Sequence, residues 1–488
     1  MPRNGIFALF LALLVLLVIA CQEQTPPAAV TADVTPTAVP TSTTTPTRPS
    51  STATISPTET AVLPTASPAS ATATATSIPC PTTADPIDTP STKPVSVYYV
   101  DEGNVRRWDE ATGETMTLVD SGDVSHLTIS DDGQFVAFLR EIEEEAGDNW
   151  PPAPVSLWVM DSDGRNQRQL FSRDNLLTLA ADDEREVFAV MPHDLTWAPG
   201  SHLLAFNPYR ICTAVGQGCH GYYNELWLVD VNSSEKRQVT PRGEGAAFTF
   251  SPDGRFVTFA DSTSIDLLNL HSNQRHQDVV VNPRIGLGHI YYMAEPAWAP
   301  DSSFFTVAVY LENPFSIPDP TFTIWQVAAD GRRQELGTFA GLSFNFGGHN
   351  GAAAFSPNRS RIAFTREKQS GSNVRELHIA QVEGKWQAQY TVGHQTRFLS
   401  WSLDGEQFLY SFGGSLRLGQ LCLEAEQLAM PAAAADTVAQ WLDGERFLYL
   451  SGEGDTTAQH RLILGTVDGG FTDIGRVDGA LYSYDWKR

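Results

Sequence analysis

Basic residues are scarce in this sequence. Its 488 residues include 32 Lys and Arg against 57 Asp and Glu, which gives a formal net charge of −25 at pH 7. A surface this acidic repels phosphate backbones, so the charge argues against nucleic acid as a partner. An acidic balance also helps solubility, so it does not by itself indicate a cationic ligand.

The sequence motifs of several enzyme classes are also absent. There is no Gly-x-Ser-x-Gly nucleophile elbow, no His-Glu-x-x-His zinc pair and no phosphate-binding glycine loop. Asp161-Ser162-Asp163-Gly164 has the start of a calcium loop but lacks the later ligands, so we interpret it as a turn. We therefore expect a protein without catalytic activity, cofactor or bound metal.

Only one long apolar run is present, and it lies at the N-terminus. Arg3 precedes an almost unbroken apolar run from Ile6 to Ala20, which is typical of an export signal and too short for an ordinary spanning helix. The run ends in Val18-Ile19-Ala20-Cys21, which resembles the bacterial lipobox. That resemblance implies cleavage of a signal peptide, 1–20, and lipids on Cys21 that anchor the chain to the outer face of the cytoplasmic membrane. The alternative is a signal peptide cut elsewhere and an incidental Cys21.

Aromatic residues are absent from residues 21–95, which consist mainly of Thr, Pro, Ala and Ser. Such a segment cannot bury enough apolar surface to offset the entropy of ordering it, so we predict a disordered stalk. Its hydroxyl groups could carry O-linked glycans, or the stalk could be a bare linker. Cys80 lies within it and is interpreted as an incidental thiol.

Cysteine is rare, with five residues in the whole chain. Cys212 and Cys219 lie close together in one glycine-containing insertion, and an exported chain reaches an oxidising compartment, so we predict a disulfide between them. His220 follows directly, but no second ligand cluster accompanies it, so a metal site is not expected. Cys422 lies in an apolar segment, 416–423, and is predicted to be a buried thiol.

What the sequence does have, from Ser96 onward, is a repeated hairpin. Ser251-Pro252-Asp253-Gly254 is a polar turn that leads into the apolar strand Phe256-Val257-Thr258-Phe259, and Ala246, Phe248 and Phe250 alternate before it. The same pattern recurs with drift at 130–138, 198–206, 299–305, 356–364, 402–408 and 442–449. A third and a fourth strand follow each hairpin. Four strands per unit predict an all-β fold, a β-propeller whose blades stack on one another.

The turn sequences resemble those of the TolB-like propellers, relatives of the WD-repeat proteins. The residues that carry the resemblance are Trp298-Ala299-Pro300-Asp301, Trp197-Ala198-Pro199 and Trp401-Ser402-Leu403-Asp404-Gly405. The resemblance covers about residues 96–488 and implies a propeller. It also allows a scaffold role in an envelope complex.

The two ends of the repeat region complete each other. Residues 96–119 supply a second, a third and a fourth strand without a first, and residues 480–486 supply a first strand with nothing after it. Paired, they close the ring and remove its open sheet edges. We predict eight blades, with seven as the alternative if one weak unit is only a connection.

Loop lengths predict which face is functional. The turns after strands one and three are short, whereas the connections after strands two and four carry the insertions, and binding residues usually lie on such loops. Aromatic and hydrogen-bonding side chains gather there and suit a peptide, protein or glycan. The candidate binding residues are Trp150, Tyr209, Tyr222, Tyr223, His289, Tyr291, Tyr292, Phe315, Phe346 and His349. The alternative for any of them is that it packs its loop onto the disc.

The sequence therefore predicts a monomeric, lipid-anchored lipoprotein whose propeller, 96–488, binds an envelope protein, peptide or glycan without catalysis. A propeller enzyme of the lyase or glycosidase type is the main alternative. It would act in the central funnel, with His193, His289 and His349 as the residues to mutate.

Overall fold

A computed structural model describes the chain from residue 93 to residue 487, with gaps. The described residues are 93–142, 153–181, 183, 186–212, 221–222, 225–287, 290–314, 316–342, 351–368, 374–394, 396–423, 426–428, 430–434, 439–452, 460–477 and 484–487. The predicted signal peptide, Cys21 and nearly all of the stalk lie outside these residues.

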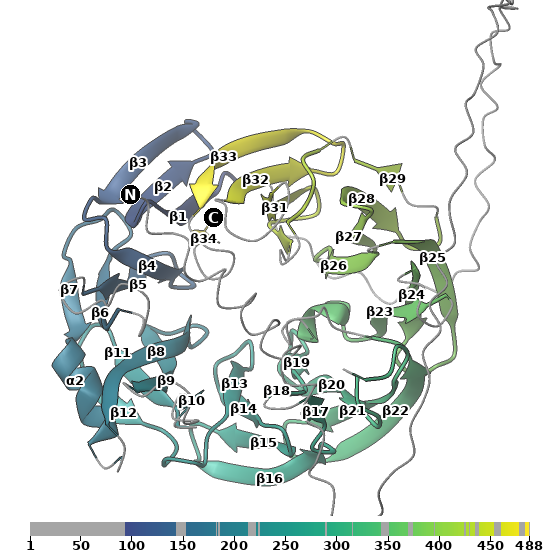
Figure 1. Ribbon diagram of the computed structural model, residues 1–488, viewed down its shortest axis with the longest axis horizontal. Coiled ribbons are helices and arrows are strands. Elements are labelled where there is room, and N and C mark those ends of the chain that lie inside the picture. The colour runs from purple at the N-terminus through teal and green to yellow at the C-terminus, as the bar shows by residue number, and fades with distance from the viewer. Residues whose placement is uncertain are drawn as a thin grey trace, which may run out of the picture. The chain divides into compact units, whose positions relative to one another are not determined.

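The described residues form eight antiparallel sheets arranged as the blades of a ring (Figure 1), which confirms the predicted propeller and its favoured blade number. Blade 1 contains β34 (Tyr484–Lys487), β1 (Ser96–Asp101), β2 (Asn104–Asp109) and β3 (Glu114–Val119). Blade 2 contains β4 (Val124–Ile129), β5 (Phe135–Glu141), β6 (Val155–Asp161) and β7 (Arg168–Phe171). Blade 3 contains β8 (Val187–Trp197), β9 (Leu203–Cys212), β11 (Trp227–Asp230) and β12 (Lys236–Gln238), and β10 (Gly221–Tyr222) also pairs with β9.

The next three blades follow the same order from the inside outward. Blade 4 contains β13 (Ala247–Phe250), β14 (Phe256–Ala260), β15 (Ser264–Asn269) and β16 (Gln274–Val281). Blade 5 contains β19 (Ala297–Trp298), β20 (Phe304–Tyr310), β21 (Thr321–Ala328) and β22 (Arg333–Ala340). Blade 6 contains β23 (Arg361–Glu367), β24 (Val374–Gln381) and β25 (Gln387–His394), and its innermost position is reduced to a bridge between Phe355 and Ile362.

The last two blades complete the ring. Blade 7 contains β26 (Arg397–Trp401), β27 (Gln407–Phe412), β28 (Ser415–Gln420) and β29 (Glu426–Gln427). Blade 8 contains β30 (Gln440–Trp441), β31 (Arg446–Ser451), β32 (His460–Thr466) and β33 (Phe471–Val477). Outside the blades lie the hairpin of β17 (Gly286–Leu287) and β18 (Ile290–Tyr291), α2 (Arg173–Leu177), and the 3-10 turns η3 (Thr178–Ala180) and η4 (Ala352–Ala354).

The ring closes as predicted, because the C-terminal strand β34 pairs antiparallel with β1 (Figure 1). Ser96 lies opposite Lys487, and Tyr99 lies opposite Tyr484. The Asp485 carboxylate also reaches blade 2, where it accepts hydrogen bonds from the Thr128 hydroxyl (3.0 Å) and the Ile129 N–H (2.9 Å). The C-terminal strand therefore joins the first two blades.

Large side chains from the second strands fill the space between blades. Phe138, Phe206, Tyr310, Tyr410 and Tyr449 each lie on the second strand of a different blade and are almost completely buried. They belong to the apolar strand that follows each repeated turn in the sequence. Burial of one such side chain stabilises the fold by about 1.5–3 kcal/mol, so the repeat supplies much of the core.

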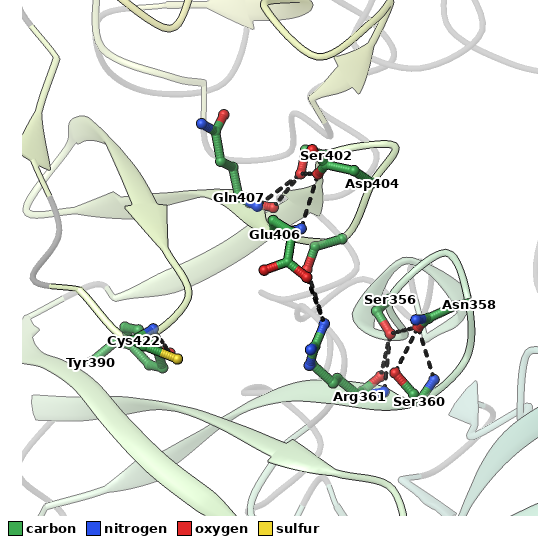
Figure 2. A network of polar contacts seen from close by, with 11 residues as sticks. Ser356, Asn358, Ser360, Arg361, Tyr390, Ser402, Asp404, Glu406, Gln407 and Cys422 are labelled. Carbon is green, nitrogen blue, oxygen red and sulfur yellow. Dashed lines mark hydrogen bonds and ion pairs between the residues drawn. The ribbon is translucent and has the colours of Figure 1, made fainter. Parts of the chain in front are cut away.

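The repeated polar turn is held by its own side chains. In blade 4, Ser251 Oγ donates to Asp253 Oδ1 (2.6 Å) and accepts from the Phe256 N–H (2.9 Å). Figure 2 shows the same arrangement around Ser356 and Ser402 in blades 6 and 7. Gly254 has a φ of +67°, and a Cβ there would lie 2.5 Å from the Pro199 carbonyl oxygen of the neighbouring blade. Any other residue at position 254 would be strained and would clash with blade 3. Glycine therefore allows the turn of blade 4 to pack directly against blade 3.

Candidate functional site

The two faces of the ring differ in their connections. We call the face with the turns after strands one and three the short-turn face, where the longest described connection is residues 162–167. We call the other the long-connection face. On it, residues 213–226 join β9 to β11, with β10 between them, and residues 282–296 join β16 to β19.

Most of the predicted binding residues lie outside the described residues. These are Trp150, Tyr223, His289, Phe315, Phe346 and His349. Tyr222 and Tyr291 lie in the short strands β10 and β18, but only their backbone is described. The side chains of Tyr209 and Tyr292 are described, and they have different surroundings.

Tyr292 is part of the core and does not face a ligand. Only 5 % of the residue is exposed, its hydroxyl donates to the Ala308 carbonyl (2.8 Å), and its ring packs edge-on against Tyr310 at 4.8 Å. Burial, together with Tyr310 and Glu295, raises the pKa of this tyrosine well above its usual range. Tyr292 therefore packs its loop onto the disc, which was the alternative to a role in binding.

Tyr209 lies on the hairpin of blade 3, which is the longest in the propeller. β8 and β9 have 11 and 10 residues, and their pairing extends from Trp197 and Leu204 near the short-turn face to Val187 and Cys212. The register shifts between His193 and Thr196, and Asp194 at this bulge has a φ of +54°. Such bulges reorient side chains, so the bulge explains how consecutive residues here bring polar groups together.

Five polar residues meet at this bulge, and we call them the blade 3 polar group: His126, His193, Asp194, Asn207 and Tyr209. His193 Nδ1 lies 2.8 Å from Asp194 Oδ1, and the His193 and Tyr209 rings are 6.0 Å apart. Asn207 Nδ2 donates to Asp194 (3.4 Å) and to the Ala246 carbonyl (3.0 Å). The group therefore combines two imidazoles, a carboxylate, an amide and a phenol at one place.

His126 reaches this group from the innermost strand of blade 2. Burial, and then the electrostatic interaction with His193, lower the pKa of His126 to about 4. It is therefore neutral near pH 7. Burial also raises the pKa of Tyr209, which keeps its hydroxyl protonated.

The polar group can offer hydrogen bonds and exchange protons, but it contains no serine, cysteine or lysine nucleophile. In the part of the chain that the structure describes, no three His, Cys, Asp or Glu side chains are placed to hold a metal ion. Sequence reasoning identified His193 and Tyr209 but missed His126, Asp194 and Asn207. The available signal for His126 was that it and His193 both lie on the innermost strand of their repeats, and these two repeats are consecutive.

A cavity of about 370 Å³ lies where the innermost strands of blades 1, 2 and 3 end. Its walls include Asp131, Trp197, Asp485 and Lys487. Burial raises the pKa of Asp485, although the hydrogen bonds from Ile129, Trp486 and Thr128 act in the opposite direction. Since these bonds engage both oxygens of the carboxylate, we assign Asp485 to ring closure.

The cysteines differ in part from expectation. Cys212 is disulfide-bonded, and its predicted partner, Cys219, lies outside the described residues. Cys422 was predicted to be a buried thiol, and this is wrong: it is disulfide-bonded and half-buried. The apolar segment that suggested burial ends in a turn after β28, so Cys422 is not in the strand itself.

No helix within the described ranges has both the length and the apolar character needed to cross a membrane.

No protein-family model and no curated protein matches this chain. Among solved structures, TolB from Acinetobacter baumannii is 15% identical over 80% of this chain and 82% of that chain, with a TM-score of 0.32. The β-propeller domain of the Trilobed protease from Pyrococcus furiosus is 13% identical over 74% and 99%, with a TM-score of 0.41. An oligogalacturonate lyase in complex with manganese is 13% identical over 72% and 85%, with a TM-score of 0.42. At these values the neighbours carry no argument about activity, and the assignment of an eight-bladed β-propeller rests on the strand pairing itself.

Proposed function

We propose that this protein is an exported lipoprotein, anchored at Cys21, whose propeller binds a protein, peptide or glycan on the long-connection face. The observation that carries the proposal is the blade 3 hairpin. Its extra length continues toward the long-connection face and bears the half-buried side chains of His193, Asp194 and Tyr209, three members of the blade 3 polar group. Aromatic rings beside hydrogen-bonding groups are suited to such ligands.

The chemistry of the short-turn face supports the same assignment. There the carboxylates of the repeated turns are already engaged by neighbouring hydroxyl and N–H groups, as at Asp253 and Asp404. Groups satisfied in this way have little to offer a ligand. Binding is therefore expected on the other face.

The test is a binding screen of the purified protein against a glycan panel and against envelope extracts, followed by titration of any ligand found. A double variant, Tyr209→Ala with Tyr222→Ala, removes one ring from β9 and one from β10, the short strand that pairs with it. Phe471→Ala is the matched control, because Phe471 is 51% exposed and begins β33 at the short-turn face.

Loss of about 1.5–3 kcal/mol of binding free energy, roughly tenfold or more in Kd, is expected for the double variant and no change for the control. The reverse pattern, or equal losses in both, would contradict the proposal. Circular dichroism must show that each variant keeps its fold.

A catalytic function is the second candidate, and the His193–Asp194 contact favours it. A carboxylate that holds an imidazole is the usual support of a general base. Turnover of a glycan or peptide that disappears in His193→Ala and persists in Tyr209→Phe would establish this function in place of simple binding.

A further inference from the structure

Cys422, which is disulfide-bonded, lies in a turn at the surface of the propeller. It lies in the turn after β28, with its backbone in the left-handed region at a φ of +67°, on the short-turn face of blade 7. Its N–H donates to the Tyr390 hydroxyl (3.0 Å) of blade 6, and Figure 2 shows the two side by side. This hydrogen bond holds the turn against the neighbouring blade in addition to the disulfide.

The partner of Cys422 must be one of the other four cysteines, which are Cys21, Cys80, Cys212 and Cys219. Cys212 is excluded because blades 3 and 7 lie on opposite sides of the ring (Figure 1), and disulfide bonding requires Cα atoms within about 7 Å.

Cys219 is accounted for by the pairing of β9 with β10. Gly221 lies opposite Arg210 and Tyr222 lies opposite Tyr209. The same register continued by two residues would bring position 219 opposite position 212. Directly opposed residues of antiparallel strands have Cα atoms about 4.5–5.5 Å apart, a separation that suits a disulfide. This pairing leaves Cys80 and Cys21 for Cys422.

Chain geometry favours Cys80. The described chain begins on the short-turn face: the Lys93 carbonyl accepts a hydrogen bond from Arg446 of blade 8 (2.7 Å), and the Val95 carbonyl accepts one from the Glu110 N–H (3.0 Å). Cys80 lies only thirteen positions before Lys93, a distance along the chain that can span about 45 Å. Blade 8 alone lies between blades 1 and 7, and packed sheets are about 10 Å apart, so Cys422 is within reach.

We propose that Cys80 and Cys422 form a disulfide that fastens the end of the stalk to the short-turn face of blade 7. The segment from Cys80 to Lys93 then crosses blade 8 and secures the ring next to its closure. The inference rests on the export assumed in the proposed function, but its test requires no ligand, so the two can fail separately.

Peptide mapping of the full-length, detergent-extracted protein tests the link directly. After thiols are blocked, cleavage at glutamate without reduction isolates Cys80 in 60–102, Cys422 in 407–424, and both Cys212 and Cys219 in 187–225. We expect 60–102 to be joined to 407–424 and to separate on reduction, while 187–225 carries its own internal disulfide. A free Cys422 thiol, or Cys422 joined to Cys21 or Cys219, would overturn the proposal.

A thermal unfolding cycle provides the second readout. Cys80→Ser and Cys422→Ser should each lower the Tm by about 5 °C, because either change opens the same long covalent loop. The double variant should show no further loss, whereas independent effects would add. Cys219→Ser is the matched control, and its effect should add to that of Cys80→Ser. Additive losses for the Cys80 and Cys422 variants would refute a shared bond.

Discussion

The short-turn face and the long-connection face are made by the same eight repeats, yet their polar groups are used differently. On the short-turn face, carboxylates such as Asp253 and Asp443 accept hydrogen bonds from their own turn and from adjacent arginines. On the long-connection side of blade 3, a bulge leaves His193, Asp194 and Tyr209 half-buried against one another. The comparison indicates that repeated polar residues stabilise the propeller, whereas the non-repeated ones are the candidates for binding.

The largest effect should follow from breaking the ion network around Arg446 on the short-turn face. Its guanidinium binds Glu110 and Asp443, and the Asp443 side chain is completely buried. Burial opposes ionisation of Asp443, but hydrogen bonds from Arg446 and the Glu445 N–H outweigh it and lower the pKa of the carboxyl. Arg446→Ala leaves a buried charge without its partner and should cost about 3 kcal/mol.

Urea unfolding at pH 7 measures this cost, with Arg332→Ala as the control, since Arg332 pairs with Asp330 at an exposed site. Exposed pairs contribute about 0–1 kcal/mol, so similar losses in the two variants would contradict the assignment. The contribution of Asp443 should be present above its unfolded pKa of about 3.9 and disappear as pH falls through its lower folded value.

The next effect concerns the turn itself. Ser251→Ala removes a fully buried hydroxyl that donates to Asp253 and accepts from the Phe256 N–H. Loss of both bonds should cost about 2 kcal/mol in urea unfolding. Ser316→Ala, at an exposed position in the connection between β20 and β21, should stay within about 0.5 kcal/mol. If the two serines proved equivalent, the faces would not differ as described.

His126 of the blade 3 polar group should make the stability of the fold depend on pH. Because the folded pKa of His126 is about 4 and its unfolded value is about 6.5, the unfolded chain binds more protons between these limits. Stability should therefore fall as pH drops from 6.5 to 4, by about 1–2 kcal/mol at pH 5. His126→Gln should flatten this part of the profile. A profile unchanged by the substitution would show that His126 is not the titrating group.

The smallest effect is expected for Tyr292, where a substitution tests whether the side chain contributes to folding stability or to ligand affinity. Tyr292→Phe removes the hydroxyl that donates to the Ala308 carbonyl and should cost about 1 kcal/mol of stability. Ligand affinity should not change, since the ring stays in the core. Reduced affinity at unchanged stability would return Tyr292 to the set of binding residues.

The sequence by itself determined the architecture, because its signals are local and repeated. Each Ser-x-Asp turn fixes a hairpin, each following apolar strand supplies a blade face, and the incomplete units at 96–119 and 480–486 indicate closure. The number of blades required the structure, since only the pairing of β34 with β1 showed that the two partial units form one blade.

Only the tertiary structure decided the surroundings of individual side chains. Tyr292 looked like a loop aromatic until Ala308 and Tyr310 were found around it. His126 lies 67 positions before His193 in the chain, yet the two interact because they lie on the innermost strands of neighbouring blades. Cys422 follows an apolar strand and still lies in a surface turn. The surroundings of Tyr292 come from β20 of blade 5, those of His126 from the neighbouring blade, and those of Cys422 from the exact end of β28, and no local pattern in the sequence encodes them.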